Sequence, residues 1–347
     1  MNPDSAVRIT AAFLAAIFVS SCAPSGSVTR EEELSPDPVM GDWRGHVVTR
    51  TGEVNPVVAQ AIALGGDSYR FVAQSEFDGR DSLRDRLFSR VVLDGTLEGD
   101  RLAVAQFPDW SVSLANGVLR GRTSGTDVDR FELKHIVRLS PCLGAAPPPG
   151  AVVLFDGTSL DGWERRDPKQ RETPVGWTIA NGVLKVAPGT GDIMTKRKFS
   201  DFQLHMEFRT PFMPEARGQG RGNSGVYLQG RYELQVLDSY GLSGEDNECG
   251  GIYKVSAPRV NMCAPPGQWQ TYDITFRAPR FRAEGTKSHD AVATVLHNGV
   301  VIHEDLVIPD VTAEAVDKDV KSPGGLLLQE HGNLVQYRNI WLVELNR

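Results

Sequence analysis

The sequence predicts an all-β protein, and two observations carry this prediction. Glycine and proline number 35 and 21 in 347 residues, above ordinary usage, which favours turns and short strands over long helices. Asn-Gly and Asp-Gly pairs begin at positions 78, 94, 116, 156, 161, 181 and 298, and such pairs suit the two-residue turns of β-hairpins. After the N-terminus, only residues 311–319 suggest a helix, and it would be short.

The composition excludes several classes of protein. A hydrophobic content of 40% is enough to form cores and argues against a disordered chain. A net charge of −7 argues against nucleic-acid binding. Only one apolar run is present, so a polytopic membrane protein is not expected.

That apolar run, residues 9–19, follows Arg8 and is too short to span a bilayer, as is typical of a signal peptide. It ends in Ser20-Ser21-Cys22, which resembles a bacterial lipobox. We therefore expect residues 1–21 to be a lipoprotein leader, Cys22 to be lipidated, and residues 22–38 to be a flexible tether. This implies export to the cell envelope, on the periplasmic or outer-membrane side, with a membrane anchor. An ordinary signal peptide with an incidental cysteine is the alternative.

The proline-rich segment 140–150 divides the rest of the chain. Residues 39–139 read as a small accessory β domain, either a barrel or a sandwich. Residues 151–347 form a second all-β unit. An exported protein can form disulfides, and Cys249 and Cys263 lie in one loop-rich stretch, so we expect a bridge between them. No CxxC or HExxH motif is present, and no metal site is assigned.

Strands of the second unit alternate between apolar and polar residues, so each would bury one face and present the other. The presented side chains are unusually rich in Gln, Tyr, Glu, His and Arg, which can hydrogen-bond to or stack on a hydroxyl-rich ligand. A hydrated outer face with large side chains is the alternative. The presented side chains are His205, Glu207, Arg209, Tyr227, Gln229, Glu233, Gln235, Gln329 and His331.

Six segments, in order along the second unit, carry a resemblance to a known family: residues 153–163, 222–227, 232–239, 269–273, 296–300 and 337–341. Together they resemble the 3-keto-disaccharide hydrolase family. The resemblance implies a concanavalin A-like jelly-roll sandwich with a carbohydrate ligand on its concave face. It also implies cleavage of 3-keto-glycosides. A preceding small β domain and a proline-rich linker are similar to those of some members.

A standard two-carboxylate glycosidase is disfavoured, because one strand carries Glu233-x-Gln235-x-Leu237 where that chemistry would need further acids. A 3-keto group instead acidifies the C2 hydrogen, so that proton abstraction, elimination and hydration give net hydrolysis. Glu233 or His331 could be the base, and Arg209 or a divalent cation could stabilise the enolate. Glu207, Asp238 or Tyr227 could assist proton transfer, although Asp238 is out of phase with Glu233. The remaining substrate-binding candidates are Gln229, Gln235, Gln329 and Asn223.

No cofactor is required by this scheme, although Asp238, Asp246 and Glu248 offer oxygen ligands to a divalent cation. No dinucleotide-binding motif is present, so a separate sugar 3-dehydrogenase is the expected functional partner. The competing interpretations are a lectin-like binder that uses the same face without catalysis, and a structural domain of the cell envelope.

Overall fold

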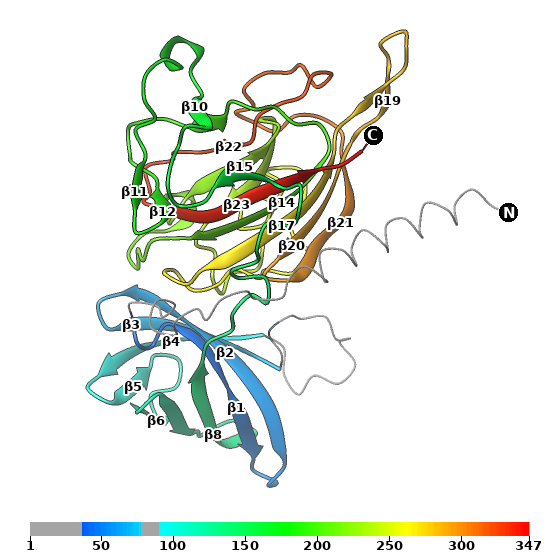
Figure 1. The fold of residues 1–347 in the computed structure, drawn as a ribbon. Helices are drawn as coiled ribbons and strands as arrows, with labels where there is room; N and C mark the ends of the chain where they lie inside the picture. Colours follow the sequence, from blue (N-terminus) through cyan, green and yellow to red (C-terminus); the bar gives the residue numbers. More distant parts are fainter. Residues whose placement is uncertain (1–36, 76, 78–89, 347) are drawn as a thin grey trace, which may run out of the picture.

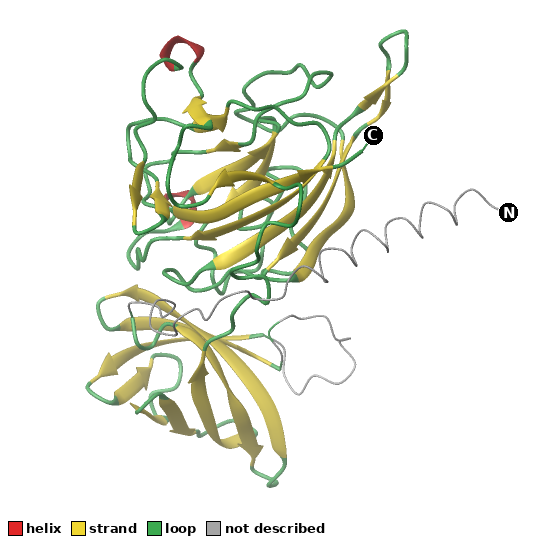
Figure 2. Cartoon of the chain, viewed as in Figure 1, coloured by secondary structure: helices red, strands yellow, loops and turns green. Residues whose placement is uncertain are grey.

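The computed structural model describes residues 37–75, 77 and 90–346. The expected leader, the lipidation site Cys22 and most of the tether lie outside these residues. In the described part, helix is limited to two short 3-10 turns, Pro168–Gln170 and Gly218–Gly220, and the predicted all-β class is confirmed (Figure 2). No helix among the described residues is long and apolar enough to cross a membrane. The helix expected over 311–319 is absent, because hydrogen bonds such as Thr312 N to Arg231 O tie this segment to the neighbouring strand as a loop.

The first unit is a closed barrel in which each strand pairs with the next and the last pairs with the first (Figure 1). Its strands are β1 (Gly41–Thr49), β2 (Val54–Gly65), β3 (Ser68–Gln74), β4 (Val91–Glu98), β5 (Arg101–Val104), β6 (Ser111–Ala115), β7 (Val118–Arg122) and β8 (Val128–Ile136). Of the two architectures expected for this unit, the barrel is the one formed.

The second unit is a sandwich of two antiparallel sheets. The five-stranded sheet contains, in spatial order, β10 (Trp163–Arg165), β13 (Ile193–Thr195), β22 (Leu327–Leu328), β15 (Ser224–Leu228) and β16 (Tyr232–Val236). The larger sheet contains β11 (Thr178–Ala180), β12 (Val183–Lys185), β23 (Gln336–Glu344), β14 (Phe202–Arg209), β17 (Gln270–Arg277), β20 (Ala291–His297) and β21 (Val300–Ile308), with β9 (Val152–Phe155) paired to β23. A separate small hairpin joins β18 (Arg280–Phe281) and β19 (Lys287–His289).

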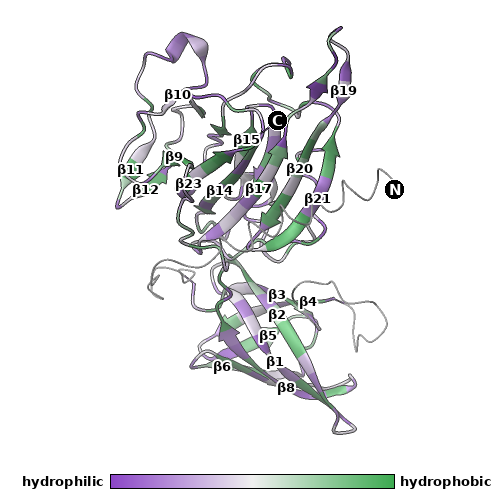
Figure 3. Cartoon of the chain, turned by 45° about the vertical axis from the view of Figure 1, so that its right-hand side comes forward, coloured by the Kyte–Doolittle hydropathy of each residue, from purple (hydrophilic) through white to green (hydrophobic). Residues whose placement is uncertain are grey.

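The core of the sandwich forms as the alternation predicts. Leu204, Met206 and Phe208 of β14 are fully buried, as are Val226 of β15 and Leu234 of β16. Figure 3 shows the apolar residues of the strands interleaved with polar ones along both units. The polar residues that alternate with the core therefore lie on the outer surfaces of the two sheets.

The linker covers the outer surface of the larger sheet. Gly144 N donates to Glu207 Oε1 at 2.7 Å, and the carbonyl of Ala145 accepts from Asn339 Nδ2 at 3.0 Å and from Trp341 Nε1 at 3.1 Å. Segment 140–150 is thus packed against the sheet.

The two units contact each other through polar groups. Tyr240 hydroxyl donates to Asp42 Oδ1 at 2.7 Å, and Arg138 Nε donates to the other oxygen of the same carboxylate at 2.7 Å. Arg217 Nη2 donates to the carbonyl of Leu64 at 2.9 Å. The barrel therefore meets the sandwich at the end where β1 begins (Figure 1).

The expected bridge between Cys249 and Cys263 is not formed in the structure, where both are buried free thiols. Cys249 Sγ lies 3.2 Å from the Tyr272 hydroxyl, and Cys263 Sγ lies 3.5 Å from the carbonyl of Leu237. The two thiols also hydrogen-bond to each other. The sequence therefore placed the two cysteines together correctly, but each sulfur is satisfied by hydrogen bonds in place of a covalent bond.

Candidate functional site

Predicted site residues meet on the outer surface of the five-stranded sheet. Strand pairing places Met194, Leu327, Tyr227 and Glu233 in one row across β13, β22, β15 and β16. Gln329 follows β22, and its N–H donates to the carbonyl of Gly225, which pairs with Gln235. We call the residues Tyr227, Glu233, Gln235 and Gln329, with Gly225 among them, the Glu233 face.

Gly225 allows the polar groups of this face to converge. A Cβ atom at this position would lie 2.8 Å from Glu233 Oε1, 3.0 Å from Tyr227 Cε2 and 3.2 Å from Gln329 Oε1. The glycine lies in a strand, where its missing side chain leaves room for close approach of neighbouring groups. Three functional side chains thus surround one backbone position.

The hydrogen bonds of the face leave acceptors unused. Gln329 Nε2 donates to the Tyr227 hydroxyl at 3.1 Å, and this hydroxyl hydrogen-bonds to the Glu233 carboxyl. Gln329 Oε1 and Gln235 Oε1 are buried and have no hydrogen-bond partner. Buried polar atoms are nearly always paired, so two unpaired acceptors beside one carboxyl are well suited to receive ligand hydroxyl groups.

Burial dominates the acid–base properties of the face. The Glu233 residue is 3% exposed. Its burial, reinforced by the charges of Asp192 and Glu314 and opposed by the hydrogen bond from Tyr227, raises the pKa of Glu233 to about 7. Burial and the neighbouring Glu233 also raise the pKa of Tyr227, which stays a neutral phenol. A carboxyl with a pKa near neutrality can take up or release a proton at the working pH.

Arg166, a cationic side chain that the sequence did not predict as part of the site, lies beside the Glu233 face. Arg166, directly after β10, donates from Nη1 to Asp192 Oδ2 at 2.8 Å and from Nη2 to the carbonyl of Glu314 at 2.6 Å. Asp192 Oδ1 also accepts from Glu330 N at 2.8 Å. Arg166, Asp192, Glu314 and Glu330 come from four separate connections between strands, and no local sequence motif marks them.

A cavity of roughly 440 Å³ opens next to this arrangement. Arg166, Met194 and Val316 line it, and Val316 packs against Met194 and Tyr227. Arg166 therefore connects the cavity with the charged groups that act on Glu233. Gln229 also lines this cavity, but its amide is used to donate to the carbonyl of Phe199 at 2.8 Å.

Asn223 extends the polar surface beyond Gln235. Gln235 Nε2 donates to Asn223 Oδ1 at 2.8 Å, and Asn223 Nδ2 donates to the carbonyl of Gln219 at 2.8 Å. Asn333 Oδ1 accepts from Asn223 N at 2.7 Å. Asn223 thus fixes the orientation of the Gln235 amide and of the turn before β15.

Glu207 and Arg209 do not share this face, and the expectation that they act together with Glu233 is wrong. Both belong to β14 in the larger sheet. Glu207 accepts from Arg338 Nε at 2.6 Å and from the linker, and Arg209 Nε donates to Gln336 Oε1 at 2.7 Å. Burial opposes ionisation of Glu207, but bonds from His205, Arg338 and Asn339 lower its pKa to about 2. This carboxylate therefore anchors the linker.

Neighbouring His205 completes this anchor. Its Nδ1 lies 2.7 Å from Asp273 Oδ1, and its Nε2 lies 3.6 Å from Glu207 Oε1. Burial alone would lower the pKa of His205, but the bonds to the two carboxylates raise it to about 9.

Asp238 is paired elsewhere, and His331 is not among the hydrogen-bonded groups of the Glu233 face. Asp238 lies two residues past the end of β16 and is out of phase with Glu233. Its carboxylate pairs with Arg221 Nε at 2.6 Å. Burial raises the pKa of Asp238, and Arg221 opposes this. His331 is exposed in the loop after β22. No group of three or more His, Cys, Asp or Glu residues among those described could hold a metal ion. Asp246 bonds to Lys254, and Glu248 accepts backbone N–H groups, so these two acids and Asp238 are engaged separately.

The second unit is similar to known proteins. Residues 150–343 match the family model of the 3-keto-alpha-glucoside-1,2-lyase-like domain. A crystal structure of a "putative glycosyl hydrolase" from Parabacteroides distasonis is 40% identical and covers 57% of this chain and 85% of its own, with a TM-score of 0.51. A second protein of that description from the same organism is 20% identical, covers 57% of this chain and 94% of its own, and has a TM-score of 0.40. A search of curated proteins found no match. Because the family model spans more than half of the sequence, the chain belongs to the family of the 3-keto-alpha-glucoside-1,2-lyase-like domain.

Proposed function

We propose that the protein is a glycoside-cleaving enzyme that acts on 3-keto-glycosides at the Glu233 face. Membership of the family supports this, as does the 40% identical structure described as a glycosyl hydrolase. The observation that carries the proposal is the buried Glu233 carboxyl, with a pKa of about 7, beside the unpaired acceptors of Gln329 and Gln235. A poised acid–base group among ligand-binding amides is the arrangement that the proposed reaction needs.

The reaction begins at C2 of the sugar. The 3-keto group acidifies the C2 hydrogen, and the Glu233 carboxylate takes this proton while the C2–H electron pair forms the enolate. The electron pair of the enolate then forms a C1–C2 double bond and restores the C3 ketone. The C1–O bond breaks at the same time, and its electrons leave with the oxygen, which is protonated. Water adds its hydroxyl to C1 and its hydrogen to C2, which completes net hydrolysis.

The neighbours of Glu233 have separate roles in this scheme. Tyr227, a neutral phenol held by Gln329, can donate a proton or hydrogen bond to the leaving oxygen. The Arg166 guanidinium lies beside the face and replaces Arg209 as the cation that stabilises the enolate. One carboxylate suffices for elimination, whereas double displacement requires a second carboxylate opposite the first.

The scheme also defines what must be supplied from outside. A sugar 3-dehydrogenase must make the ketone, because the sequence has no dinucleotide-binding motif of its own. A divalent cation at the enolate oxygen is the alternative to Arg166. Loss of activity in a chelator, restored by the metal, would favour the cation.

We propose the same export and lipid anchoring that the N-terminal sequence predicts. Mass spectrometry of the mature protein from a bacterial host should find an acylated N-terminal Cys22. A soluble product cleaved elsewhere would contradict this.

The test is turnover of 3-keto-trehalose, with products followed by mass spectrometry. We expect free 3-keto-glucose and glucose from the wild type, and about 10³-fold slower release from Glu233→Gln. Glu207→Gln, a carboxyl-to-amide change in the other sheet, is the matched control and should retain the turnover per folded molecule. Saturable binding without product would instead support the lectin-like interpretation.

A further inference from the structure

The barrel encloses an apolar cavity of roughly 340 Å³, separate from the Glu233 face. Side chains reach it from alternate positions along the strands, as in the interior of any closed barrel. The lining pairs are Val57 and Ala59, Phe71 and Ala73, Val91 and Leu93, Leu102 and Val104, and Phe131 and Leu133. Eight-stranded barrels are either filled by their own side chains or hold one small ligand. The remaining space places this barrel in the second group.

The cavity is closed toward the sandwich. Trp43 and Tyr69 are buried near that end of the barrel, and Trp43 Nε1 donates to the carbonyl of Val39 at 3.0 Å. At the opposite end lie Val47 and Val57, which flank the turn between β1 and β2. Figure 1 shows that this turn points away from the second unit. The cavity therefore opens away from the sandwich.

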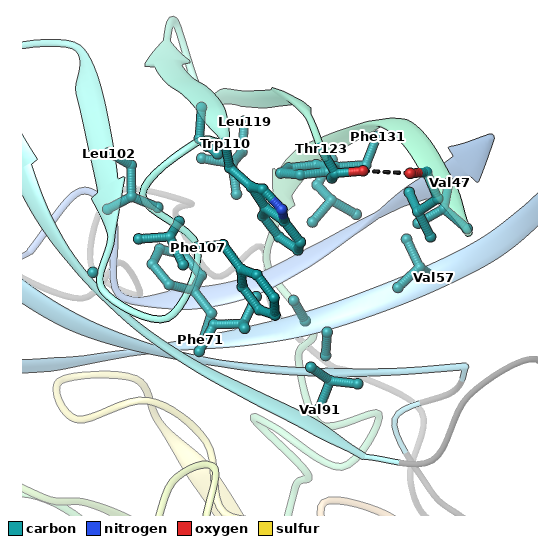
Figure 4. A pocket seen from close by; sticks show the side chains of 18 of the residues that line it. Val47, Val57, Phe71, Val91, Leu102, Phe107, Trp110, Leu119, Thr123 and Phe131 are labelled. Carbon is teal, nitrogen blue, oxygen red and sulfur yellow. Dashed lines mark hydrogen bonds between the residues drawn. The ribbon is translucent and has the colours of Figure 1, made fainter. Parts of the chain in front are cut away.

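Two aromatic side chains from the loop between β5 and β6 cover part of this opening. The rings of Phe107 and Trp110 stack with centroids 4.3 Å apart, and Trp110 Nε1 donates to the carbonyl of Ser124 at 3.1 Å. Figure 4 shows both rings and that of Phe71 directed into the same space. Both aromatic side chains of the loop are only partly buried, so the opening is reachable from solvent.

This interior is unsuited to water. Its volume equals that of about ten water molecules at ~30 Å³ each, but water in a cavity needs polar partners. The lining hydroxyls of Thr123 and Thr126 lie near the opening and already donate to the carbonyl of Val128. An apolar ligand needs no hydrogen-bond partners, and it would be stabilised in the cavity by the removal of its apolar surface from water.

A positive charge lies at the rim. Arg50, in the turn between β1 and β2, donates from Nε to the carbonyl of Thr126 at 2.6 Å and from Nη2 to that of Thr123 at 3.1 Å. Both threonines line the cavity. These bonds hold an exposed guanidinium beside an apolar interior. A ligand with a long apolar part and one anionic end matches this arrangement.

We propose that the barrel binds one fatty acid, with its acyl chain in the cavity and its carboxylate at Arg50. The test is isothermal titration of the full chain with dodecanoate below its micelle concentration. We expect one site and a negative heat-capacity change. Binding should weaken about fourfold for each methylene removed from the acyl chain, and decanoate, which is two methylenes shorter than dodecanoate, tests this. Absence of binding by dodecanoate would overturn the proposal.

Variants locate the ligand. Ala73→Phe fills the cavity and should abolish binding, whereas Ala103→Phe adds the same group on the outer side of β5 and should not. Circular dichroism confirms folding, and Val91→Phe serves as a second filling variant. Unchanged dodecanoate binding in a folded filling variant would refute the site.

The head group is tested separately. Arg50→Gln should weaken dodecanoate binding about tenfold and leave dodecanol binding unchanged. An equal effect on both ligands, or on neither, would refute the contact between carboxylate and Arg50.

Discussion

Replacing Glu233 by Gln should change how stability depends on pH. Burial, with Asp192 and Glu314, raises the pKa of Glu233 from 4.5 to about 7 in the folded protein. A raised folded-state pKa contributes stability that is fully present below pH 4.5 and lost as the pH rises through 7. Between pH 5 and pH 8 this loss is about 2.5 kcal/mol. Because glutamine cannot ionise, Glu233→Gln should not show this loss of stability.

The assay is urea unfolding of the wild type and Glu233→Gln at pH 5 and pH 8. The variant should gain about 2.5 kcal/mol relative to the wild type between these two values, and effects of the substitution that do not depend on pH cancel. Glu304→Gln, which alters an exposed carboxylate paired with Arg259, is the control and should show no such gain. A parallel pH dependence of the wild type and Glu233→Gln would show that Glu233 is not held at a raised pKa.

Three further predictions concern the two sheets and the reaction. Glu207→Gln should lower the stability of the sandwich by about 3 kcal/mol, because it leaves the buried His205 and the partly buried Arg338 without their carboxylate, and thermal unfolding measures this. Gly225→Ala should reduce turnover about 100-fold by displacing the carboxyl of Glu233. Gly162→Ala, where a Cβ meets nothing within 4 Å, should leave turnover unchanged. Equal turnover by the two variants would show that a Cβ at position 225 does not displace Glu233. The kcat/KM of the wild type should rise between pH 5 and pH 8 with a midpoint near 7 as Glu233 loses its proton, and a flat profile would exclude it as the base.

Turn signals predicted the all-β class, and local alternation predicted part of the candidate site. Tyr227 and Glu233 lie in adjacent strands, and a period of two is enough to place each on the outer face once the apolar residues are buried. The same alternation predicts that Leu204 and Met206 of β14 are buried, and both are. Alternation thus identifies the face of each strand reliably.

Alternation does not show which sheet a strand joins. Glu207 has the same pattern as Glu233, yet β14 pairs with β17 and β23 in the larger sheet. That sheet is covered by the linker, whose contacts with Glu207 span more than 60 positions of the sequence. Asp192, whose charge raises the pKa of Glu233, and Arg166, which pairs with Asp192, are also far from Glu233 in the sequence. Such groupings depend on topology, which the order of polar and apolar residues does not encode.

A local turn signal also failed where packing overrode it. Asp94-Gly95 was expected to form a hairpin turn but lies inside β4. Gly95 lines the barrel cavity, and a Cβ there would lie 3.0 Å from Leu102 Cδ1. The glycine is therefore used for close packing across the barrel, which the dipeptide alone does not reveal.

The proposed reaction depends on the removal of the C2 proton of a 3-keto-glycoside by Glu233. It is tested most directly by incubating 3-keto-trehalose with the protein in deuterated water and measuring deuterium at C2 of the remaining substrate and of the product. The wild type should introduce deuterium and cleave the sugar, Glu207→Gln should do both, and Glu233→Gln should do neither. Deuterium incorporation and cleavage by Glu233→Gln at the wild-type rate would contradict the account.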